Sequence, residues 1–579
     1  MSTAAPSAES PIRAVAAGRS WRIGLDTLLF PGVTILIAAA ILFPLGFLVY
    51  GAVTTVPIGA PNEGFTLENF ARVLTSPRYL QAIWHTLLTS TFATLLAGAI
   101  GIMMAWLVTR TDVPGVRWIR LGVMIPFFVS PFVGALAWSM LAQRDVGLIN
   151  IVLSGLGLPQ MNVYSIGGII WVLGLYYAPY IFIFTSSALY NMDPQLEESA
   201  QMSGLNRRQV MLRITVPLVT PAILSGMLLT FVSTAGQFGV PAVLGTPFNF
   251  YVMTTYIYDL TQTYPSQFNR AAALSFVLLF IAAFFVWMQN RIVRGRSYTT
   301  LGGKGFRPRI IPLGRLRWVA AGLAGLFILL SSILPLGIIA YASLVKIYTA
   351  EFSLSLLTLE NYRELFLVND MSRRAIQNTL ILALAAATLA TYLAVIVNWI
   401  TLRSRVTYRH WLDYIVMLPI SVPHVVLAIG MLWTYIYLPL PIYGTLWILL
   451  IGYVTGFIPY AVRNVGATFM QIDKGLEEAA TMVGAGWLRT VREVTLPLLK
   501  PGMVGAWMLL FIIYVRELTT SIFLYSPRNE VLAVLIFNRW AEGDYSALCA
   551  MAVVQVFFIG AVIFLAGYVF KVDIARTQQ

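Results

Sequence analysis

Long apolar runs alternate with short polar segments along almost the whole chain of 579 residues. A helix that crosses a bilayer needs about 20 mainly apolar residues, and twelve runs approach or exceed this length. The first six lie near 29–51, 82–109, 119–141, 166–190, 218–236 and 270–290. The next six lie near 318–343, 377–401, 411–436, 442–462, 501–524 and 548–570. The pattern predicts an all-α polytopic membrane protein with about 12 transmembrane helices.

Composition agrees with a lipid-embedded chain. Hydrophobic residues make up 58% of the sequence and charged residues only 11%, whereas a soluble domain carries about 25% charged residues. The single cysteine, Cys549, excludes an internal disulfide and a cysteine metal site. His85, His410 and His424 are far apart in the sequence, so we expect no metal site and no cofactor. The first apolar run is long enough to span a membrane, which predicts an uncleaved helix.

Positive charge indicates how the spans are oriented. If the N-terminus is cytoplasmic, the cytoplasmic segments hold 27 of the 38 Lys and Arg residues and the outer loops hold 9. Cytoplasmic loops of membrane proteins carry an excess of Lys and Arg, so both termini are predicted to be cytoplasmic. The net charge of +14 is thus explained by orientation, and we expect no nucleic-acid partner.

The chain contains an internal repeat. At a constant offset of 280, four residues of one segment match four of another: Glu198, Gly204, Pro217 and Pro221 with Glu478, Gly484, Pro497 and Pro501. Nearer the N-terminus, "TLENF" at 66–70 matches "TLENY" at 358–362 at offset 292, and Pro126 matches Pro419 at offset 293. The difference in offset places extra length in the first half, after Trp138.

The repeat divides the predicted spans into two groups of six. An even number of spans gives both halves the same orientation, so the repeat is parallel. The sequence predicts six-helix halves at 29–290 and 318–570, a basic cytoplasmic linker at 291–317, and cytoplasmic tails at 1–28 and 571–579.

The repeated segments are polar loops before the fifth span of each half. Asp193-Pro194 and Asp473 are helix-start signals, and the acidic residues that follow lie where the helix dipole favours negative charge. Ala200 and Ala480 leave one helix face thin, which would allow close approach of another protein. Gly204 and Gly484 allow a sharp turn. A single such helix could lie on the membrane surface, but two in register favour a shared partner on the same membrane side.

The loops resemble the "EAA" loop of bacterial ABC importer permeases. The motif reads Glu198-Ser199-Ala200 to Gly204 in the first copy and Glu478-Ala479-Ala480 to Gly484 in the second, each followed by the Pro of "VP" or "LP". The resemblance covers nearly the whole chain as two fused halves. It implies the type I ABC importer permease fold, a bacterial inner-membrane location and loops that dock on ATPase subunits. The candidate coupling residues are Glu197, Glu198, Ala200, Gly204, Glu477, Glu478, Ala480 and Gly484.

The chain cannot itself be the ATPase, because it lacks a phosphate-binding loop, and as a transport subunit it is not expected to be an enzyme. That loop needs G-x-x-x-x-G-K-[ST], and the nearest match, at Gly303-Lys304, has Tyr298 and Gly305 at two required positions. The resemblance implies instead two cytoplasmic ATP-binding cassette subunits and a periplasmic solute-binding protein as partners, within the lipid bilayer.

Three segments are similar to fused ferric-ion uptake permeases: "AGQFGVPAVLGTP" at 235–247, "YVMTTYIY" at 251–258 and "VRELTTSIFLYSP" at 515–527. The resemblance implies ferric iron as the cargo, and related permeases for polyamines, thiamine or phosphonates stay open as alternatives. Candidate residues of the translocation path are Gln237, Arg516 and Glu517. Charged residues at membrane depth are costly and suggest function, although Arg516 and Glu517 could also bond to neighbouring helices. Tyr176, Tyr177 and Tyr180 are interpreted as interfacial belt residues.

Two other classes explain less of the sequence. An ion-coupled secondary transporter would account for twelve helices and a parallel repeat, but not for the two Glu-Gly-Pro loops. An intramembrane enzyme would need a Ser-His dyad or paired carboxylates, and the predicted spans contain neither.

Overall fold

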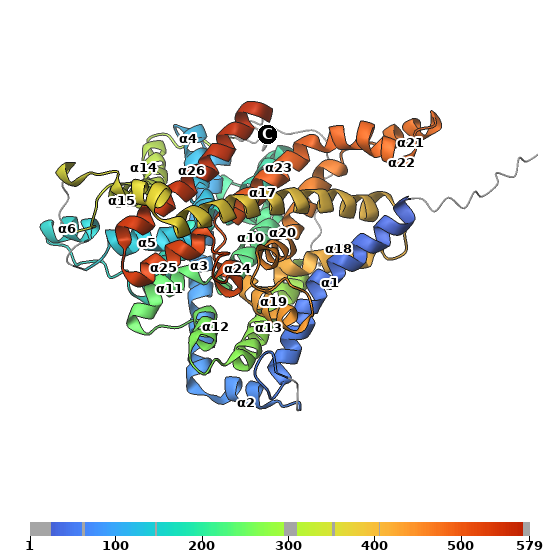
Figure 1. Ribbon diagram of the computed structural model, residues 1–579. Coiled ribbons are helices and arrows are strands. Elements are labelled where there is room, and N and C mark those ends of the chain that lie inside the picture. The colour runs from blue at the N-terminus through green and yellow to red at the C-terminus, as the bar shows by residue number, and fades with distance from the viewer. Residues whose placement is uncertain are drawn as a thin grey trace, which may run out of the picture.

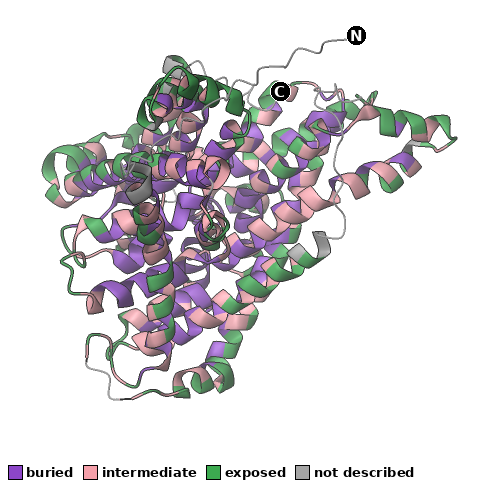
Figure 2. Ribbon diagram, turned by 90° about the vertical axis from the view of Figure 1, so that its right-hand side faces the viewer, coloured by how far each residue is buried: buried purple, intermediate pink, exposed green. Residues whose placement is uncertain are grey.

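The computed structural model describes residues 25–60, 64–144, 147–293, 310–349, 354–404 and 406–570. Most of the predicted N-terminal tail, the C-terminal tail and much of the linker, including Gly303-Lys304, lie outside these ranges. Within them every regular element is helical, and only three isolated β-bridges occur. Buried residues fill the centre of the helical bundle, and exposed ones lie on its periphery and loops (Figure 2).

Ten helices of the described chain are long and apolar enough to cross a membrane. Five belong to the first half: α1 Leu25–Val53, α3 Pro77–Arg110, α7 Ile166–Tyr190, α10 Val216–Ala235 and α13 Phe268–Val293. Five belong to the second half: α14–η3–α15 Leu316–Ser343, α17–η6 Asp370–Arg403, α20 Leu446–Phe469, α23 Leu496–Val515 and α26 Tyr545–Phe570.

The third predicted span of each half is not one straight helix, so that part of the prediction is wrong. The run 119–141 is α4 Val116–Phe128 and α5 Pro131–Leu141, which meet at 98°. The run 411–436 is α18 Arg409–Met417 with η7 Leu418–Ser421, followed at 110° by α19 His424–Tyr437. The residue before a proline is disfavoured in the helical region. Each break accordingly precedes a proline, Pro131 or Pro423, where the backbone is extended.

Each bent pair still carries the chain across the bundle once. Arg110 ends α3, and its guanidinium donates to the carbonyl of Leu189 near the end of α7 (3.3 Å). α3 and α7 therefore run in the same direction, and the chain between them must return. In the second half, Arg403 donates to the carbonyl of Ile472, just after α20 (2.7 Å). The described chain thus makes twelve crossings, as two parallel sets of six.

The eleventh predicted span, 501–524, also differs from prediction. Its helix α23 ends at Val515, and a separate short helix, α24 Thr519–Leu524, follows. The carboxylate of Glu517 accepts from the backbone N–H of Thr520 (2.8 Å) and so stabilises the start of α24. The first half has the same plan, with α10 ending at Ala235 and α11 Gly239–Gly245 following.

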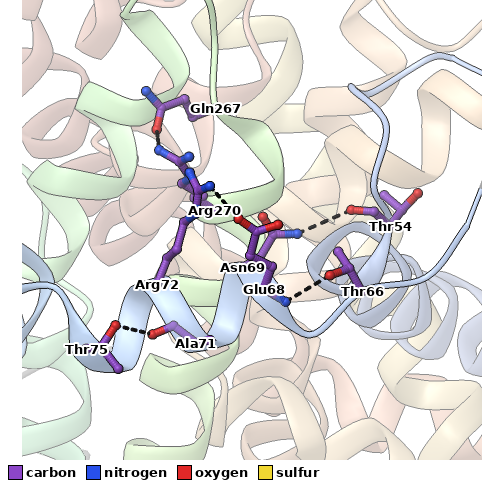
Figure 3. A network of polar contacts seen from close by, with 9 residues as sticks. All are labelled: Thr54, Thr66, Glu68, Asn69, Ala71, Arg72, Thr75, Gln267 and Arg270. Carbon is purple, nitrogen blue, oxygen red and sulfur yellow. Dashed lines mark hydrogen bonds and ion pairs between the residues drawn. The ribbon is translucent and has the colours of Figure 1, made fainter.

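The internal repeat extends to individual hydrogen bonds. Asn69, on α2 Glu68–Thr75, donates to the carbonyls of Ala52 and Thr54 (Figure 3), while Asn361 donates to those of Ser343 and Val345. Figure 3 also shows Arg72 beside Glu68 and Arg270 bonded to Gln267. The matching contacts confirm two copies of one six-helix unit.

The first span of each half packs against the opposite half. α1 lies along α18 and α19, while α15 lies on α5 and α14 on α4 (Figure 1). Small residues permit this close approach: a Cβ on Gly430 would come within 2.2 Å of the carbonyl oxygen of Pro44. Small residues also line α3, where a Cβ on Gly101 would be 2.7 Å from the carbonyl oxygen of Ala178 on α7. Close backbone packing of this kind holds helices together in lipid.

Candidate functional site: the paired loops and the breaks in the fifth spans

The two polar loops form helical hairpins that project from the bundle. The first consists of α8 Pro194–Met202 and α9 Arg207–Val210, and the second of α21 Lys474–Met482 and α22 Trp487–Thr490. α21 and α22 stand clear of the spans in Figure 1. Six crossings separate the first loop from the second, so both lie on the same side of the membrane. We refer to these hairpins as the paired loops.

The predicted helix starts and turns are confirmed. The side chain of Asp193 accepts from the N–H of Gln195 (2.9 Å), and that of Asp473 accepts from the N–H of Gly475 (2.8 Å). Gly204 and Gly484 end the two helices in the left-handed region, at φ +87° and +85°. Glycine adopts this conformation without the steric cost of a Cβ.

Adjacent glutamates of each loop differ in exposure. Glu198 and Glu478 are exposed, whereas Glu197 is buried and Glu477 is partly buried. The carboxylates of Glu198 and Glu478 are therefore accessible to a partner protein in this structure. Ala200 and Ala480 are half-buried, and both hinge glycines are exposed.

Apolar side chains accompany the exposed glutamates. Met202 is 90% exposed and Met482, its counterpart in the repeat, is 87% exposed. Leu196 and Leu476, at the start of the same helices, are also exposed. Residues i and i+4 share one face of a helix, so each glutamate and the following methionine lie on the same face. Exposed apolar groups rimmed by polar residues mark protein interaction sites, and methionine adapts to irregular surfaces.

The inward glutamates join the loops to the spans. Glu197 pairs with Arg110 (3.1 Å) and accepts from the hydroxyl of Thr215 (2.6 Å). We refer to Arg110, Glu197 and Thr215 as the first clamp.

The second half repeats the arrangement. Glu477 pairs with Arg403 (3.1 Å) and accepts from the hydroxyl of Thr495 (3.3 Å). Arg403, Glu477 and Thr495 form the second clamp. Sequence reasoning assigned both arginines to loops and missed the clamps, although Arg110 and Arg403 keep the repeat offset of 293.

The three path candidates lie at the breaks after α10 and α23. The guanidinium of Arg516 donates to the carbonyl of Val129 (2.9 Å), in the break between α4 and α5, and lies over the ring of Phe127. In the first half, Gly236 lies against Pro423, in the break between η7 and α19. Each broken fifth span thus meets the broken third span of the other half.

Arg516 and Glu517 both have protein partners, since Glu517 caps α24. Gln237 is half-buried, and its backbone carbonyl accepts from the hydroxyl of Thr254 (2.8 Å). The structure therefore brings all three candidates to two equivalent breaks, where each also has a structural role.

The tyrosines near this region face the protein interior. Tyr176 and Tyr177 are 1% and 7% exposed, so their interpretation as interfacial belt residues is wrong. Tyr180 stacks on Tyr177, with ring centroids 5.3 Å apart. Within the described residues, no three His, Cys, Asp or Glu side chains are grouped closely enough to hold a metal ion.

Comparison with known proteins gives a family match. The model for "binding-protein-dependent transport system inner membrane component" matches residues 97–298 and 386–576. The chain is 26% identical to the ferric transport system permease protein FbpB of Actinobacillus pleuropneumoniae, over 90% of this chain and 76% of the relative. It is 26% identical to the Fe(3+)-transport system permease protein FbpB 2 of Haemophilus influenzae, over 87% and 93% respectively.

Among solved structures, a chain of a bacterial alginate ABC transporter in complex with an alginate-bound periplasmic protein is similar. The match has 23% identity and a TM-score of 0.41, and it covers 48% of this chain and 97% of that one.

The hinge glycines give a test of the loop geometry. Because a Cβ on Gly204 or Gly484 would meet no atom within 4 Å, a Gly204→Ala, Gly484→Ala variant carries only backbone strain. That strain is about 1–2 kcal/mol at each position, which corresponds to about 5- to 30-fold faster amide hydrogen exchange in α8 and α21. Gly486→Ala is the matched control, since Gly486 is equally unobstructed and has no positive φ. Equal exchange in the variant and the control would contradict the assigned turn.

Proposed function

The chain belongs to the binding-protein-dependent transport system inner membrane components and is an ABC importer permease, and from this premise we propose its cargo, its partners and its orientation. The cargo is ferric iron, delivered by a periplasmic solute-binding protein. Two cytoplasmic ATP-binding cassette subunits bind the paired loops, one on α8 and one on α21. Both termini lie in the cytoplasm.

The exposed faces of the paired loops support the docking role. Each offers a carboxylate and a flexible thioether, Glu198 with Met202 and Glu478 with Met482, on a helix that stands away from the bundle. The two surfaces are equivalent under the repeat, which suits two copies of one partner. A charged contact at the rim fixes orientation, while the apolar contact supplies most of the binding energy. ATP binding that draws the partners together would then draw the paired loops together.

The breaks in the fifth spans support an alternating-access path. Irregular backbone within the membrane is tolerated where it is buried in protein or lines a cavity. The breaks at Gln237 and at Arg516-Glu517 lie between the halves, against the breaks of the third spans. We assign these three residues to the constriction of the path, which opens when the halves separate. Separation would break the contact of Arg516 with Val129.

Similarity to two ferric transport permeases over most of the chain supports iron as the cargo. Ferric ion is a hard cation that prefers oxygen ligands. Tyr180 stacks on Tyr177 and contacts the ring of Phe127, over which Arg516 lies, so phenol oxygen atoms are present at this break, and the described residues hold no preformed metal cluster. Weak contacts of this kind suit passage rather than retention, so specificity would reside in the binding protein. A polyamine, thiamine or phosphonate cargo is the alternative.

The docking role is tested by charge reversal in the assembled complex. Glu198→Arg with Glu478→Arg places like charges against a partner surface built for carboxylates, a change that costs several kcal/mol. ATPase subunits are expected to co-purify at least about tenfold less, and ATP-dependent uptake of ferric iron into proteoliposomes is expected to fall with them. Glu364→Arg, an exposed carboxylate in an outer segment, should leave ATPase binding unchanged. Normal binding and normal uptake in the double variant would rule out docking at these helices.

Uptake that an excess of spermidine, thiamine or 2-aminoethylphosphonate abolishes would rule out iron as the specific cargo.

The proposed orientation is tested with single cysteines. Cys549 is the one native cysteine and is buried, so Cys549→Ala gives a cysteine-free background. Val483→Cys in the second paired loop and Tyr264→Cys in an outer segment both replace highly exposed residues. In cells that lack the ATPase subunits, a membrane-impermeant maleimide added outside should label only the cysteine at 264. Labelling of the cysteine at 483 from outside intact cells would show the opposite orientation and contradict the proposal.

A further inference from the structure

Three elements of each half meet at one carboxylate. In the first clamp, Arg110 ends the second span, Glu197 lies on α8, and Thr215 ends the π-helical turn η1 Met211–Thr215 that leads into the fifth span. One oxygen of Glu197 faces the guanidinium and the other accepts from the hydroxyl. The second clamp repeats this plan with Arg403, Glu477 and Thr495, which ends η8 Val491–Thr495.

The arginines also hold the backbone beside the loops. Arg110 donates to the carbonyl of Leu189, and Arg403 donates to that of Ile472. Each arginine therefore contacts the chain before the loop as well as the loop helix itself, and the threonine holds the same carboxylate after the loop. Both flanks and the centre of each loop are fixed to the end of one span.

Burial distinguishes the clamps from surface ion pairs. The side chains of Arg110 and Glu197 are 1% and 10% exposed, and those of Arg403 and Glu477 are 9% and 12% exposed. Removing one partner from a buried pair leaves an uncompensated charge and is strongly unfavourable. Arg489 and Glu493, which pair on the second loop, are 69% and 57% exposed, and such a pair contributes little.

The first clamp also holds the segment that leads into the second half. The N–H of Ile311 donates to the carbonyl of Arg110 (2.7 Å), and the N–H of Leu313 donates to the carboxylate of Asp112 (2.8 Å). Thr111 and Ile311 form a parallel β-bridge. This segment immediately precedes α14, so the start of the second half is tied to the clamp of the first.

We propose that Arg110 and Arg403 are positioning residues that make each coupling helix one rigid unit with the second and fifth spans of its half. This inference rests on the proposed function of the paired loops and adds the path by which their displacement reaches the membrane. Movement of α8 or α21 is transmitted through the carboxylate to two spans at once. In the first half it also reaches α14 through residues 311–313.

The test removes both charges of each clamp together, so that no buried charge is left alone. The variant carries Arg110→Met, Glu197→Met, Arg403→Met and Glu477→Met. The control is Glu360→Met with Arg363→Met, an exposed ion pair outside the paired loops. Both are assembled with ATPase subunits and iron-loaded binding protein in proteoliposomes. Co-purification of ATPase subunits, stimulation of ATP hydrolysis by the binding protein and ferric iron imported per ATP are then measured.

We expect the clamp variant to bind the ATPase subunits while stimulation and iron imported per ATP fall on the order of tenfold. The control keeps both values. A separate variant with Arg110→Lys and Arg403→Lys, which keeps the positive charges, is expected to show more stimulation than the methionine variant and less than the unsubstituted chain. Normal stimulation in the clamp variant would overturn the inference, because it would show that the signal reaches the spans without the clamps.

Failure of the proposed function gives a different result. In that case the unsubstituted complex itself shows no binding of ATPase subunits or no iron uptake. If only the cargo is wrong, stimulation by the cognate binding protein still reports on the clamp. If the four-fold methionine variant does not fold, a variant with Arg110→Gln, Glu197→Gln, Arg403→Gln and Glu477→Gln removes the same charges and keeps polar side chains that can hydrogen-bond. The same loss of stimulation is expected from it, to a smaller degree, and normal stimulation would again overturn the inference.

Discussion

A largely buried carboxylate held by an arginine and a threonine fixes each paired loop to the membrane-spanning bundle. Glu197 and Glu477 turn from the polar loops toward the bundle, and Arg110 and Arg403 contact them at the ends of long apolar helices. These contacts hold the hairpins to the spans in addition to the chain on either side. Because low dielectric strengthens the pairs and makes their separation costly, the exposed faces bearing Glu198 and Glu478 are presented at a defined position.

The lipid environment explains how the rest of the molecule is arranged around these loops. Backbone N–H and C=O groups inside a bilayer need hydrogen-bond partners within the protein. A break in a span is therefore tolerated where other helices pack around it. Both broken third spans and both broken fifth spans meet there, with Arg516 bonded to the carbonyl of Val129 across the halves. The first spans cross to the opposite half, where Gly430 allows α19 to approach Pro44 of α1. Each half is thereby packed against the first span of the other.

Much of this could be predicted from residue patterns. Apolar run lengths gave twelve crossings, and the 280-residue offset predicted two equivalent loops with caps at Asp193 and Asp473. The breaks at Pro131 and Pro423 could not be predicted, because Pro179 and Pro459 lie inside helices that continue. The difference depends on which helices pack around each proline. The inward orientation of Glu197 rather than Glu198 likewise depends on an arginine 87 residues away, and burial of Tyr176 depends on the neighbouring helix α5.

The central claim is that ATP drives the paired loops together and thereby moves the spans fixed to them. The most direct test is the distance between spin labels on the two loops, measured by pulsed electron resonance in the complete complex with ATPase subunits and binding protein. Ser203→Cys and Val483→Cys, both exposed, carry the labels in a Cys549→Ala background. The account predicts that the distance shortens when a non-hydrolysable nucleotide binds and returns when nucleotide is removed. A distance that is the same in the nucleotide-free and nucleotide-bound complexes would contradict it.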